Sequence, residues 1–446
     1  MSWRVHARTR KLSGEMGARM NDFHRLSATE CVEEIRSGRL SSVDLVNDCL
    51  RRIAIREPVI GAWAHLDAEF ARAQARAADA AKAAGKPLGP LHGVPVGIKD
   101  IIDTQDLATE HGTPAFAGRR PSHDAEVVRR LKSAGAIILG KTVTTELAFY
   151  GPGKTRNPAD PNRTPGGSSS GSAAAVADFH VPLALGSQTA GSILRPASYC
   201  GVMGFKPTFG LIPLDGVIEQ SPPLDTLGGY ARSAADLALL TAVLSGTPCA
   251  LPDLSARPLR LVFIKTPAWP QGDQVMRDSL ERLALANTDV VDEMGMPASF
   301  DDTGGLQRAV QFHDIAKNYG PIVDKHAAVM SPKLKEVIAE GRTVSDAEYE
   351  AARARREPLT QSLDHIFAAY DAILTPAAQG VAPQGLSATG SPMFNFIWTY
   401  LGLPAISIPL LNVGSLPLGV QLVAPRGADA RLLVVADRAL RTLKPN

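Results

Sequence analysis

One lysine and two clusters of serines are the residues of this chain whose types and spacing could do covalent chemistry. Lys99 ends the short apolar run 94–98, so its stem is expected in the interior, where desolvation lowers the pKa of an ammonium group. A lysine that is neutral at neutral pH can take a proton from a serine hydroxyl. The serines lie in two glycine-rich segments, 166–171 and 186–192, where small residues permit tight turns whose N–H groups point into a pocket. Lysine and serine together could then perform nucleophilic acyl chemistry without a histidine.

Two other motifs match known signatures but fail on context. Residues 135–142 fit the phosphate-loop pattern G-x-x-x-x-G-K-[ST], yet the four middle residues are Ala, Ile, Ile and Leu, which favour a buried strand. Residues 167–171 fit the nucleophile-elbow pattern G-x-S-x-G around Ser169, yet the loop-like segment 157–165 precedes them instead of a strand. We therefore expect neither nucleotide binding nor a Ser-His-Asp triad.

Short apolar runs alternate with helical patterns along the chain. Capping-type serines open helices after Ser27, Ser41 and Ser345, the last of them a long one. Further helices are predicted at 66–84, with Gly85 as the C-terminal cap, and at 124–134. Strands are predicted at 94–98, 136–139, 181–185, 372–374, 405–410 and 419–423. This alternation predicts an α/β fold in which helices cover both faces of a large mixed sheet.

The predicted domain organisation is one domain preceded by an extension. Residues 1–21 are expected to be disordered; they lack the apolar segment of a secretory signal, and Met20 is an alternative start to Met1. Residues 22–446 are expected to form a single domain. Its parts are a core catalytic region at about 66–246, a variable and mainly helical insertion at about 247–360, and a part that completes the sheet at about 361–446.

Composition excludes several classes of protein. The 47 basic and 45 acidic residues leave a net charge of +2, so nothing points to nucleic acid or to an anionic membrane. No run approaches the roughly 18 apolar residues of a membrane span. The four cysteines have no close spacing, which argues against a zinc site or a disulfide framework and favours reduced thiols in the cytoplasm. The 39 glycines and 33 prolines indicate many loops and close-packed turns.

Several blocks of sequence, in the same order, resemble the amidase signature family, and together they span roughly residues 22–440. Ser168 and Ser192 are 24 residues apart, the separation usual in that family. The resemblance implies the amidase signature fold. The matching blocks are GPLHGVPVGIKD at 89–100, GGSSSGSA at 166–173, GSQTAGSILRPA at 186–197, GFKPT at 204–208, DTLG at 225–228, LPAISIP at 403–409 and PLGVQLV at 417–423.

The resemblance also implies roles for individual residues. Ser192 would be the nucleophile that becomes acylated, and Ser168, after a cis peptide bond from Gly167, would bridge it to the base Lys99. The family's oxyanion hole corresponds to the backbone N–H groups of Thr189, Ala190, Gly191 and Ser192. Neither a metal nor an organic cofactor is implied.

The chain departs from the family pattern close to the proposed nucleophile. Gln188 replaces a common aspartate, and Ala190 and Ser170 replace common glycines. The arginine often found two residues after the nucleophile is Leu194 here, with Arg195 beside it, and Gly229-Tyr230 replaces a usual Pro-Met. We expect Gln188, Ser169 and Arg195 to support the loop rather than to react.

The resemblance implies an amidase that cleaves a small-molecule carboxamide with water, in the cytoplasm, as a monomer or a homodimer. A glutaminase-type subunit of a tRNA-dependent amidotransferase and a biuret- or allophanate-type hydrolase are the alternatives. An inactive binding module of the same fold would lack Ser192 or Lys99, and both are present. Tyr150, Phe394 and Trp398 are candidates for an apolar substrate pocket, although core packing accounts for them equally well.

Overall fold

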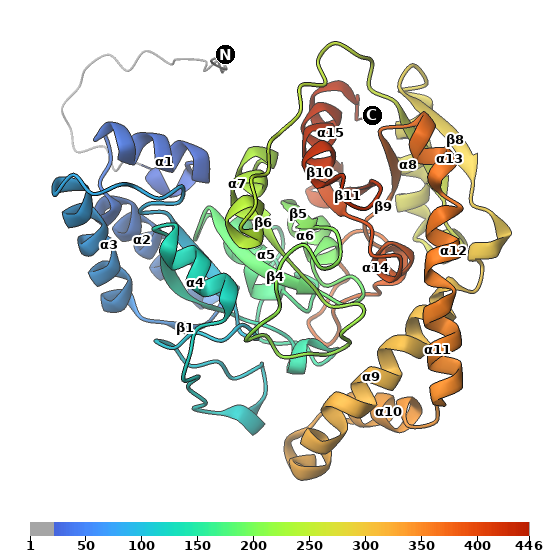
Figure 1. Ribbon diagram of the computed structural model, residues 1–446, viewed down its shortest axis with the longest axis horizontal. Coiled ribbons are helices and arrows are strands. Elements are labelled where there is room, and N and C mark those ends of the chain that lie inside the picture. The colour runs from blue at the N-terminus through green and yellow to red at the C-terminus, as the bar shows by residue number, and fades with distance from the viewer. Residues whose placement is uncertain (1–21, 446) are drawn as a thin grey trace.

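One mixed sheet of 11 strands runs through the computed structural model, which describes residues 22–445. The expectation of disorder at 1–21 lies outside the described residues. The strand order is β1-β3-β2-β4-β6-β5-β10-β11-β9-β7-β8 (Figure 1). Strand β2 pairs in parallel with both β3 and β4, whereas β4 pairs antiparallel with β6, so the sheet is mixed near its centre.

All six predicted strands are present, with ends shifted by up to three residues. The strands are β1 (Trp63–Leu66), β2 (Pro95–Lys99), β3 (Ile137–Thr142), β4 (Leu183–Gln188), β5 (Met203–Lys206), β6 (Thr226–Ala231), β7 (Leu261–Lys265), β8 (Val291–Gly295), β9 (Ala372–Pro376), β10 (Ala405–Val413) and β11 (Leu416–Val423). Strands β1, β5, β6, β7 and β8 are additional to the prediction. Two of these, β7 and β8, belong to the segment 247–360, which is otherwise mainly helical.

The helices begin where the capping serines predict. Ser27 and Ser345 form full capping boxes with Glu30 and Glu348, and the Ser41 side chain accepts from Asp44 N–H. The helices are α1 (Ala28–Ser37), α2 (Ser42–Ile60), α3 (Ala68–Ala83), α4 (Glu126–Ser133), α5 (Ser170–Ala177), α6 (Leu194–Cys200), α7 (Ala234–Ser245), α8 (Gln274–Leu285), α9 (Thr303–Lys325), α10 (Pro332–Gly341), α11 (Asp346–Ala354), α12 (Arg356–Gln361), α13 (Asp364–Ala369), α14 (Phe396–Tyr400) and α15 (Asp429–Thr442).

The long helix predicted after Ser345 is shorter than expected. Helix α11 ends at Ala354, and α12 begins at Arg356 and contains Pro358. Proline has no N–H to donate, and its ring clashes with the carbonyl four residues earlier, which is that of Ala354. The proline therefore accounts for the break.

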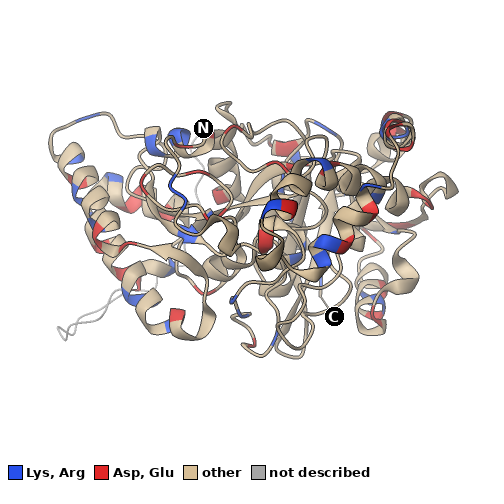
Figure 2. Cartoon of the chain, turned by 90° about the horizontal axis from the view of Figure 1, so that it is seen from below, with Lys and Arg blue, Asp and Glu red and all other residues tan. Residues whose placement is uncertain are grey.

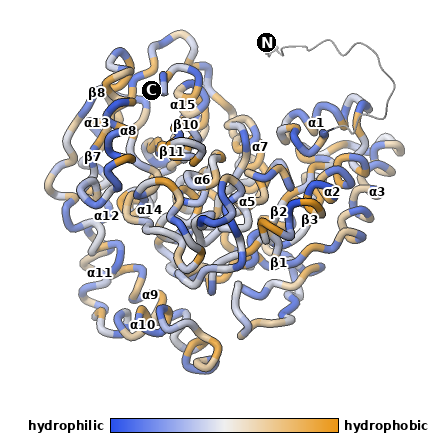
Figure 3. Tube along the Cα trace, turned by 180° about the vertical axis from the view of Figure 1, so that it is seen from behind, coloured by the Kyte–Doolittle hydropathy of each residue, from blue (hydrophilic) through white to orange (hydrophobic). Residues whose placement is uncertain are grey.

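Strand side chains alternate between two cores, one on each face of the sheet. On β3, Ile138 packs into one hydrophobic cluster, which also holds residues of α4, α7 and α15, whereas Ile137 and Leu139 pack into the cluster of α3, α5 and α6. This alternation is the period-two pattern of a strand buried on both faces. Figure 3 shows β2 and β3 as hydrophobic segments between the helices. The predicted α/β class, a mixed sheet with helices on both faces, is confirmed.

Basic and acidic residues are mixed along the described chain. Figure 2 shows lysines and arginines interspersed with aspartates and glutamates. Among residues 22–445, no helix combines the length and the apolar character that crossing a bilayer requires. All four cysteines are free thiols, three buried and Cys249 partly buried.

Candidate active site

The side-chain nitrogen of Lys99 contacts two serine hydroxyls inside the protein. Lys99 is the last residue of β2, and its Nζ lies 2.7 Å from Ser168 Oγ and 2.8 Å from Ser187 Oγ. Strands β2 and β4 are parallel neighbours, so Lys99 and Ser187 sit at the carboxyl ends of adjacent strands. Ser187 was not singled out from the sequence as a site residue, although it lies in the second hydroxyl cluster.

Burial sets the protonation of this lysine. Lys99 is fully buried, and desolvation holds its pKa well below the ordinary value, an effect that the negative charge of Asp225 only partly offsets. A lysine with such a low pKa can exist as the free amine, which accepts a proton from a neighbouring hydroxyl. The geometry therefore places a potential base directly against Ser168.

Ser192 is brought beside the Ser168 segment. The peptide bond between Gly167 and Ser168 is cis. Ser169 N–H donates to the Ser192 carbonyl at 3.3 Å, and the Tyr230 hydroxyl donates to the same oxygen at 3.1 Å. The Ser192 residue is partly exposed, whereas Lys99 and Ser168 are buried. Ser192 is thus the more accessible of the two serines, and Ser168 and Lys99 are enclosed by the protein.

Four consecutive backbone N–H groups around Ser192 are left open. Among the described residues, none of the N–H groups of 189–192 donates a hydrogen bond, whereas the next two are occupied. Gln188 Oε1 accepts from Ile193 N–H at 2.8 Å and from Leu194 N–H at 3.1 Å. Buried N–H groups are normally paired, so a run of open ones is a place where an anionic oxygen can bind.

Gln188 also ties this loop to the C-terminal part of the chain. Its Nε2 donates to Thr399 Oγ1 at 2.9 Å, and the Thr399 hydroxyl donates to the Ala190 carbonyl at 2.7 Å. A Cβ atom at Gly191 would clash with the side chain of buried Asn395, so glycine is favoured there. The glutamine in place of the family's aspartate thus makes hydrogen bonds on both sides of the loop.

Arg195 holds the segment before Ser168. This buried guanidinium donates from Nη2 to the Gly167 carbonyl at 2.6 Å and from Nε to the Thr389 carbonyl at 2.8 Å. Ser169 plays a similar part toward β4, because its hydroxyl lies 3.2 Å from both the carbonyl and the N–H of Ser187. Both residues contact backbone that carries the serines and not the serine hydroxyls themselves.

We expect Arg195→Met to lower the free energy of unfolding by about 1–3 kcal/mol, because it leaves two buried carbonyls unpaired. Arg195→Lys should recover part of this loss, since it keeps one donor. Thermal or urea unfolding measures the difference. Arg342→Met is the matched control, because Arg342 is exposed and forms its ion pair with Asp324, which is also exposed. A variant at 195 as stable as wild type would show that these hydrogen bonds do not support the fold.

Asp225 supports the other side of the open N–H groups. Its Oδ1 accepts from the Thr189 hydroxyl at 2.5 Å, and its Oδ2 accepts from the N–H groups of Gln220 and Ser221 at 2.8 and 3.0 Å. Burial raises the pKa of Asp225 to about 6, against the lowering effect of these hydrogen bonds. The only sequence signal for this residue was its place in the DTLG block at 225–228.

A small cavity adjoins Ser187, although Lys99, Ser168 and Ser192 do not line it. It is narrow, with a volume of about 10 Å³, and its polar side is formed by Ser187, Thr189, Gln220 and Asp225. Its apolar side is formed by Ile101, Ala148, Leu214, Val217 and Ile218, with Glu219 at the edge. The cavity therefore offers one wall for hydrocarbon and one for hydrogen-bonding groups.

The aromatic residues proposed for the pocket are not in this lining. Phe394 and Trp398 are each at most 1% exposed and pack in two hydrophobic core clusters. Tyr150 packs by its ring on Phe149, close in sequence to the cavity residue Ala148. The sequence alone did not distinguish aromatic residues of the core from those of a pocket, because both kinds are apolar and occur at similar positions along helices and strands.

The two competing motifs behave as predicted. Residues 137–142 of the phosphate-loop match form strand β3, and Lys141 is buried, with its Nζ 2.8 Å from the Ile102 carbonyl and 3.3 Å from Asp100. Ser169 is the N-cap of α5 and follows a loop. Within the described part of the chain, no cluster of His, Cys, Asp and Glu could hold a metal ion.

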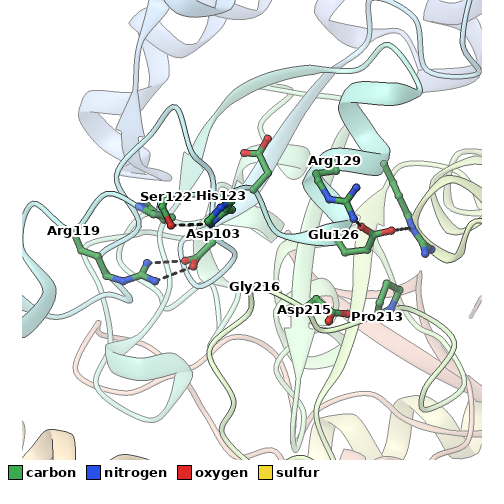
Figure 4. A pocket seen from close by; sticks show the side chains of 12 residues that line it. Asp103, Arg119, Ser122, His123, Glu126, Arg129, Pro213, Asp215 and Gly216 are labelled. Atoms are coloured by element: carbon green, nitrogen blue, oxygen red, sulfur yellow. Dashed lines mark hydrogen bonds and ion pairs between the residues drawn. The ribbon is translucent and has the colours of Figure 1, made fainter.

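A second hollow lies on the surface, away from the serines in sequence. Figure 4 shows that its charged side chains pair with one another, Arg119 with Asp103 and Arg129 with Glu126. None of Lys99, Ser168 and Ser192 lines it. The geometry of the serine cluster, and not this hollow, therefore defines the candidate site.

The chain belongs to the amidase family, whose model matches residues 44–433, and it is an amidase signature hydrolase that acts on carbon–nitrogen bonds. A protein of Mycobacterium tuberculosis provisionally named amidase AmiD is 34% identical over 94% of both chains. A glutamyl-tRNA(Gln) amidotransferase subunit of Salinispora arenicola is 32% identical over 94% of this chain and 97% of that one. A crystal structure of an amidase superimposes with a TM-score of 0.86 at 28% identity, covering 94% of this chain and all of the other.

Proposed function

We propose that this protein hydrolyses the carboxamide bond of a small molecule through a Lys99–Ser168–Ser192 triad. The observation that carries the proposal is the hydrogen bond of 2.7 Å between Lys99 Nζ and Ser168 Oγ, in a buried site beside Ser192. A serine nucleophile needs a base within hydrogen-bond reach, directly or through a relay. The open N–H groups of 189–192 add to the support.

In the proposed reaction, Ser192 Oγ attacks the amide carbon while its proton passes to Ser168 and the Ser168 proton passes to neutral Lys99. The N–H groups of Thr189, Ala190, Gly191 and Ser192 bind the oxygen that becomes negative. Lys99 returns a proton through Ser168 to the nitrogen, and the C–N bond breaks to release the amine or ammonia. Water then cleaves the Ser192 ester by the same proton route, giving the carboxylic acid. Each step uses only side chains and backbone N–H groups of this chain, together with water.

The proposed substrate is a small amide, in keeping with the narrow cavity of about 10 Å³ beside Ser187. We place the enzyme in the cytoplasm, without a nucleic-acid or membrane partner, as a monomer or a homodimer. The net charge of the protein is only +2, so the protein as a whole would attract a charged substrate weakly over long distances. This supports a substrate whose binding does not depend on such attraction.

A panel of amides tests this function. Aliphatic, aryl, peptide-terminal and urea-like amides, biuret among them, are incubated with the enzyme, and released ammonia or amine is measured. With hydroxylamine present, an acyl-enzyme would also yield the hydroxamate. A Ser192→Ala preparation purified identically excludes a contaminating amidase. If no member releases ammonia or amine, the hydrolase assignment fails.

A second candidate is the glutaminase-type subunit of a tRNA-dependent amidotransferase, which the relatives of that name favour. Free glutamine carries a carboxylate, and no lysine or arginine lines the described cavity beside Ser187 to bind it. Glutaminase activity and co-purification with partner subunits would support this candidate. Rapid hydrolysis of small amides with inert glutamine would exclude it.

A further inference from the structure

The N-terminus of helix α10 is capped by a residue that is distant in the sequence. Ser331 is the N-cap of α10, and its hydroxyl accepts from the Leu334 N–H at 3.3 Å. In a capping box, a glutamate or glutamine at this third helical position would accept from the N-cap N–H, but leucine has no polar side-chain atom. Glu146, 185 residues earlier, supplies the carboxylate: it accepts from the Ser331 N–H at 3.0 Å and from the Ser331 hydroxyl.

Capping alone does not explain this arrangement. Helices α1 and α11 close the same box with glutamates of their own, Glu30 and Glu348, and both of these side chains are exposed. Glu146 is only 8% exposed, and burying a carboxylate costs more solvation energy than leaving it at the surface. The place of Glu146 in the chain indicates a second role.

The two residues after Glu146 have an unfavourable backbone conformation. Leu147 and Ala148 have φ angles of 47° and 57°, in the left-handed region that side chains with a Cβ atom rarely adopt. Such a conformation persists only where surrounding contacts hold it. Here the Leu147 N–H donates to the His111 carbonyl at 2.8 Å, and Gln220 Nε2 donates to the Ala148 carbonyl at 3.2 Å. The contact of Glu146 with α10 fixes the other end of the segment.

The same segment contacts the candidate active site. Thr145, the residue before Glu146, donates its N–H to the Ser168 carbonyl at 3.2 Å. Ala148, two residues after Glu146, lines the cavity beside Ser187. A shift of residues 145–148 would therefore move the backbone of Ser168 and one wall of the cavity together.

We propose that Glu146 is a positioning residue that couples helix α10 to the backbone of Ser168. Its carboxylate holds residues 145–148 in place, so that the Ser168 hydroxyl keeps its hydrogen bond of 2.7 Å with Lys99. Helix α10 packs on α9 within the mainly helical segment 247–360 (Figure 1), so this segment takes part in organising the site. The inference rests on the proposed amidase function and deepens it.

Glu146→Met removes the carboxylate and keeps a side chain of similar length. We expect kcat on the best substrate of the amide panel to fall by about tenfold to a hundredfold, because small displacements of reacting groups cost that much. Glu146→Gln should stay within about threefold of wild type, since its amide can accept from the Ser331 N–H and donate to the Ser331 hydroxyl. Urea unfolding of each variant gives the folded fraction, and kcat is expressed per folded enzyme.

Ser331→Asp separates positioning from capping. Aspartate is as good an N-cap residue as serine, so α10 keeps its cap, but the new carboxylate would repel that of Glu146. We expect kcat to fall by about tenfold. Adding Glu146→Gln should restore kcat to within about threefold of wild type, because the glutamine amide can donate to the aspartate. These variants keep α10 capped and decide the question even if Glu146→Met fails to fold.

Glu348→Met is the matched control. Glu348 accepts from the N–H and the hydroxyl of Ser345 at the start of α11, the same capping contacts that Glu146 makes, but it is exposed. Its removal should lower the urea midpoint slightly and leave kcat within about twofold of wild type. An equal loss of kcat in Glu348→Met would overturn the inference, because any weakened cap in the segment 247–360 would then have the same effect.

The remaining outcomes separate the two claims. If Glu146→Met and Ser331→Asp lower the urea midpoint but keep the wild-type kcat per folded enzyme, Glu146 is only a structural cap, and the amidase function still stands. A loss in Ser331→Asp that Glu146→Gln does not restore would also overturn the inference. If wild type cleaves no member of the amide panel, the proposed function fails, and this inference fails with it.

Discussion

Ser192→Ala is expected to lower kcat/KM for every amide substrate by about 10⁴–10⁶-fold, because alanine has no oxygen to form the acyl-enzyme. The N–H groups of 189–192 remain in place, so substrate binding should change little, and the loss should fall on kcat. Steady-state kinetics on the best substrate of the panel measures both constants. The residual rate would report binding and oxyanion stabilisation alone.

The matched control is Ser170→Ala, in the other serine cluster. Ser170 is buried, and its hydroxyl has no hydrogen-bond partner among the described residues, so its removal should change activity by less than about threefold. Residues that act as one unit have non-additive effects. The double variant Ser192→Ala with Lys99→Met should therefore be no less active than Ser192→Ala alone. Full activity in Ser192→Ala would show that the nucleophile is another residue.

Lys99→Met is expected to lower kcat/KM by about 10²–10⁴-fold, the range of a general acid–base catalyst. Methionine matches the length of lysine but can neither accept nor return a proton. In wild type, activity should fall as pH drops and Lys99 becomes protonated. The pH profile of the variant should lack this acidic limb. If the pH profile of Lys99→Met kept the acidic limb, the group that titrates there, and therefore the base, would be a residue other than Lys99.

The same substitution should change how stability depends on pH. Burial holds the folded-state pKa of Lys99 well below its ordinary value of 10.5, so between these two values the unfolded chain binds more protons than the folded chain. Stability then rises with pH across this window and is lost as pH falls from 10.5 toward the folded-state pKa. The wild-type protein should therefore gain stability relative to Lys99→Met as pH is raised toward 10.5.

Lys206→Met separates burial from catalysis. Lys206 is also fully buried, and desolvation lowers its pKa to about 7, but among the described residues its Nζ donates to the Pro207 carbonyl alone. Its removal should change the stability profile in the same direction, in the window from about 7 to 10.5, while activity stays within about threefold of wild type. A large loss of activity in this variant would show that burying methionine disturbs the site indirectly.

Much of the fold was predictable because some strands are continuous apolar runs. Strands β2 and β3 are buried on both faces, and a strand of that kind appears in sequence as a block of Val, Ile and Leu. Strand β6, Thr226–Ala231, contains two glycines that weaken strand propensity, so pairing with β4 and β5 must define it. Strand β7 was not predicted from the sequence for a different reason, because the segment around it is mainly helical.

The sequence by itself determined which residues could carry the chemistry: a lysine at the end of an apolar run, two serines 24 residues apart, and the small residues around them. These features are local, so spacing and residue type suffice to find them. Only the tertiary structure decided what surrounds them. Ser187 meets Lys99 across 88 residues, and Gln307 reaches Thr189 across 118, because neighbouring strands and a packed helix bring them together. Hydrogen bonds between residues so far apart produce no periodic pattern in the sequence. The contacts that support the site can therefore be identified only from the assembled sheet and its helices.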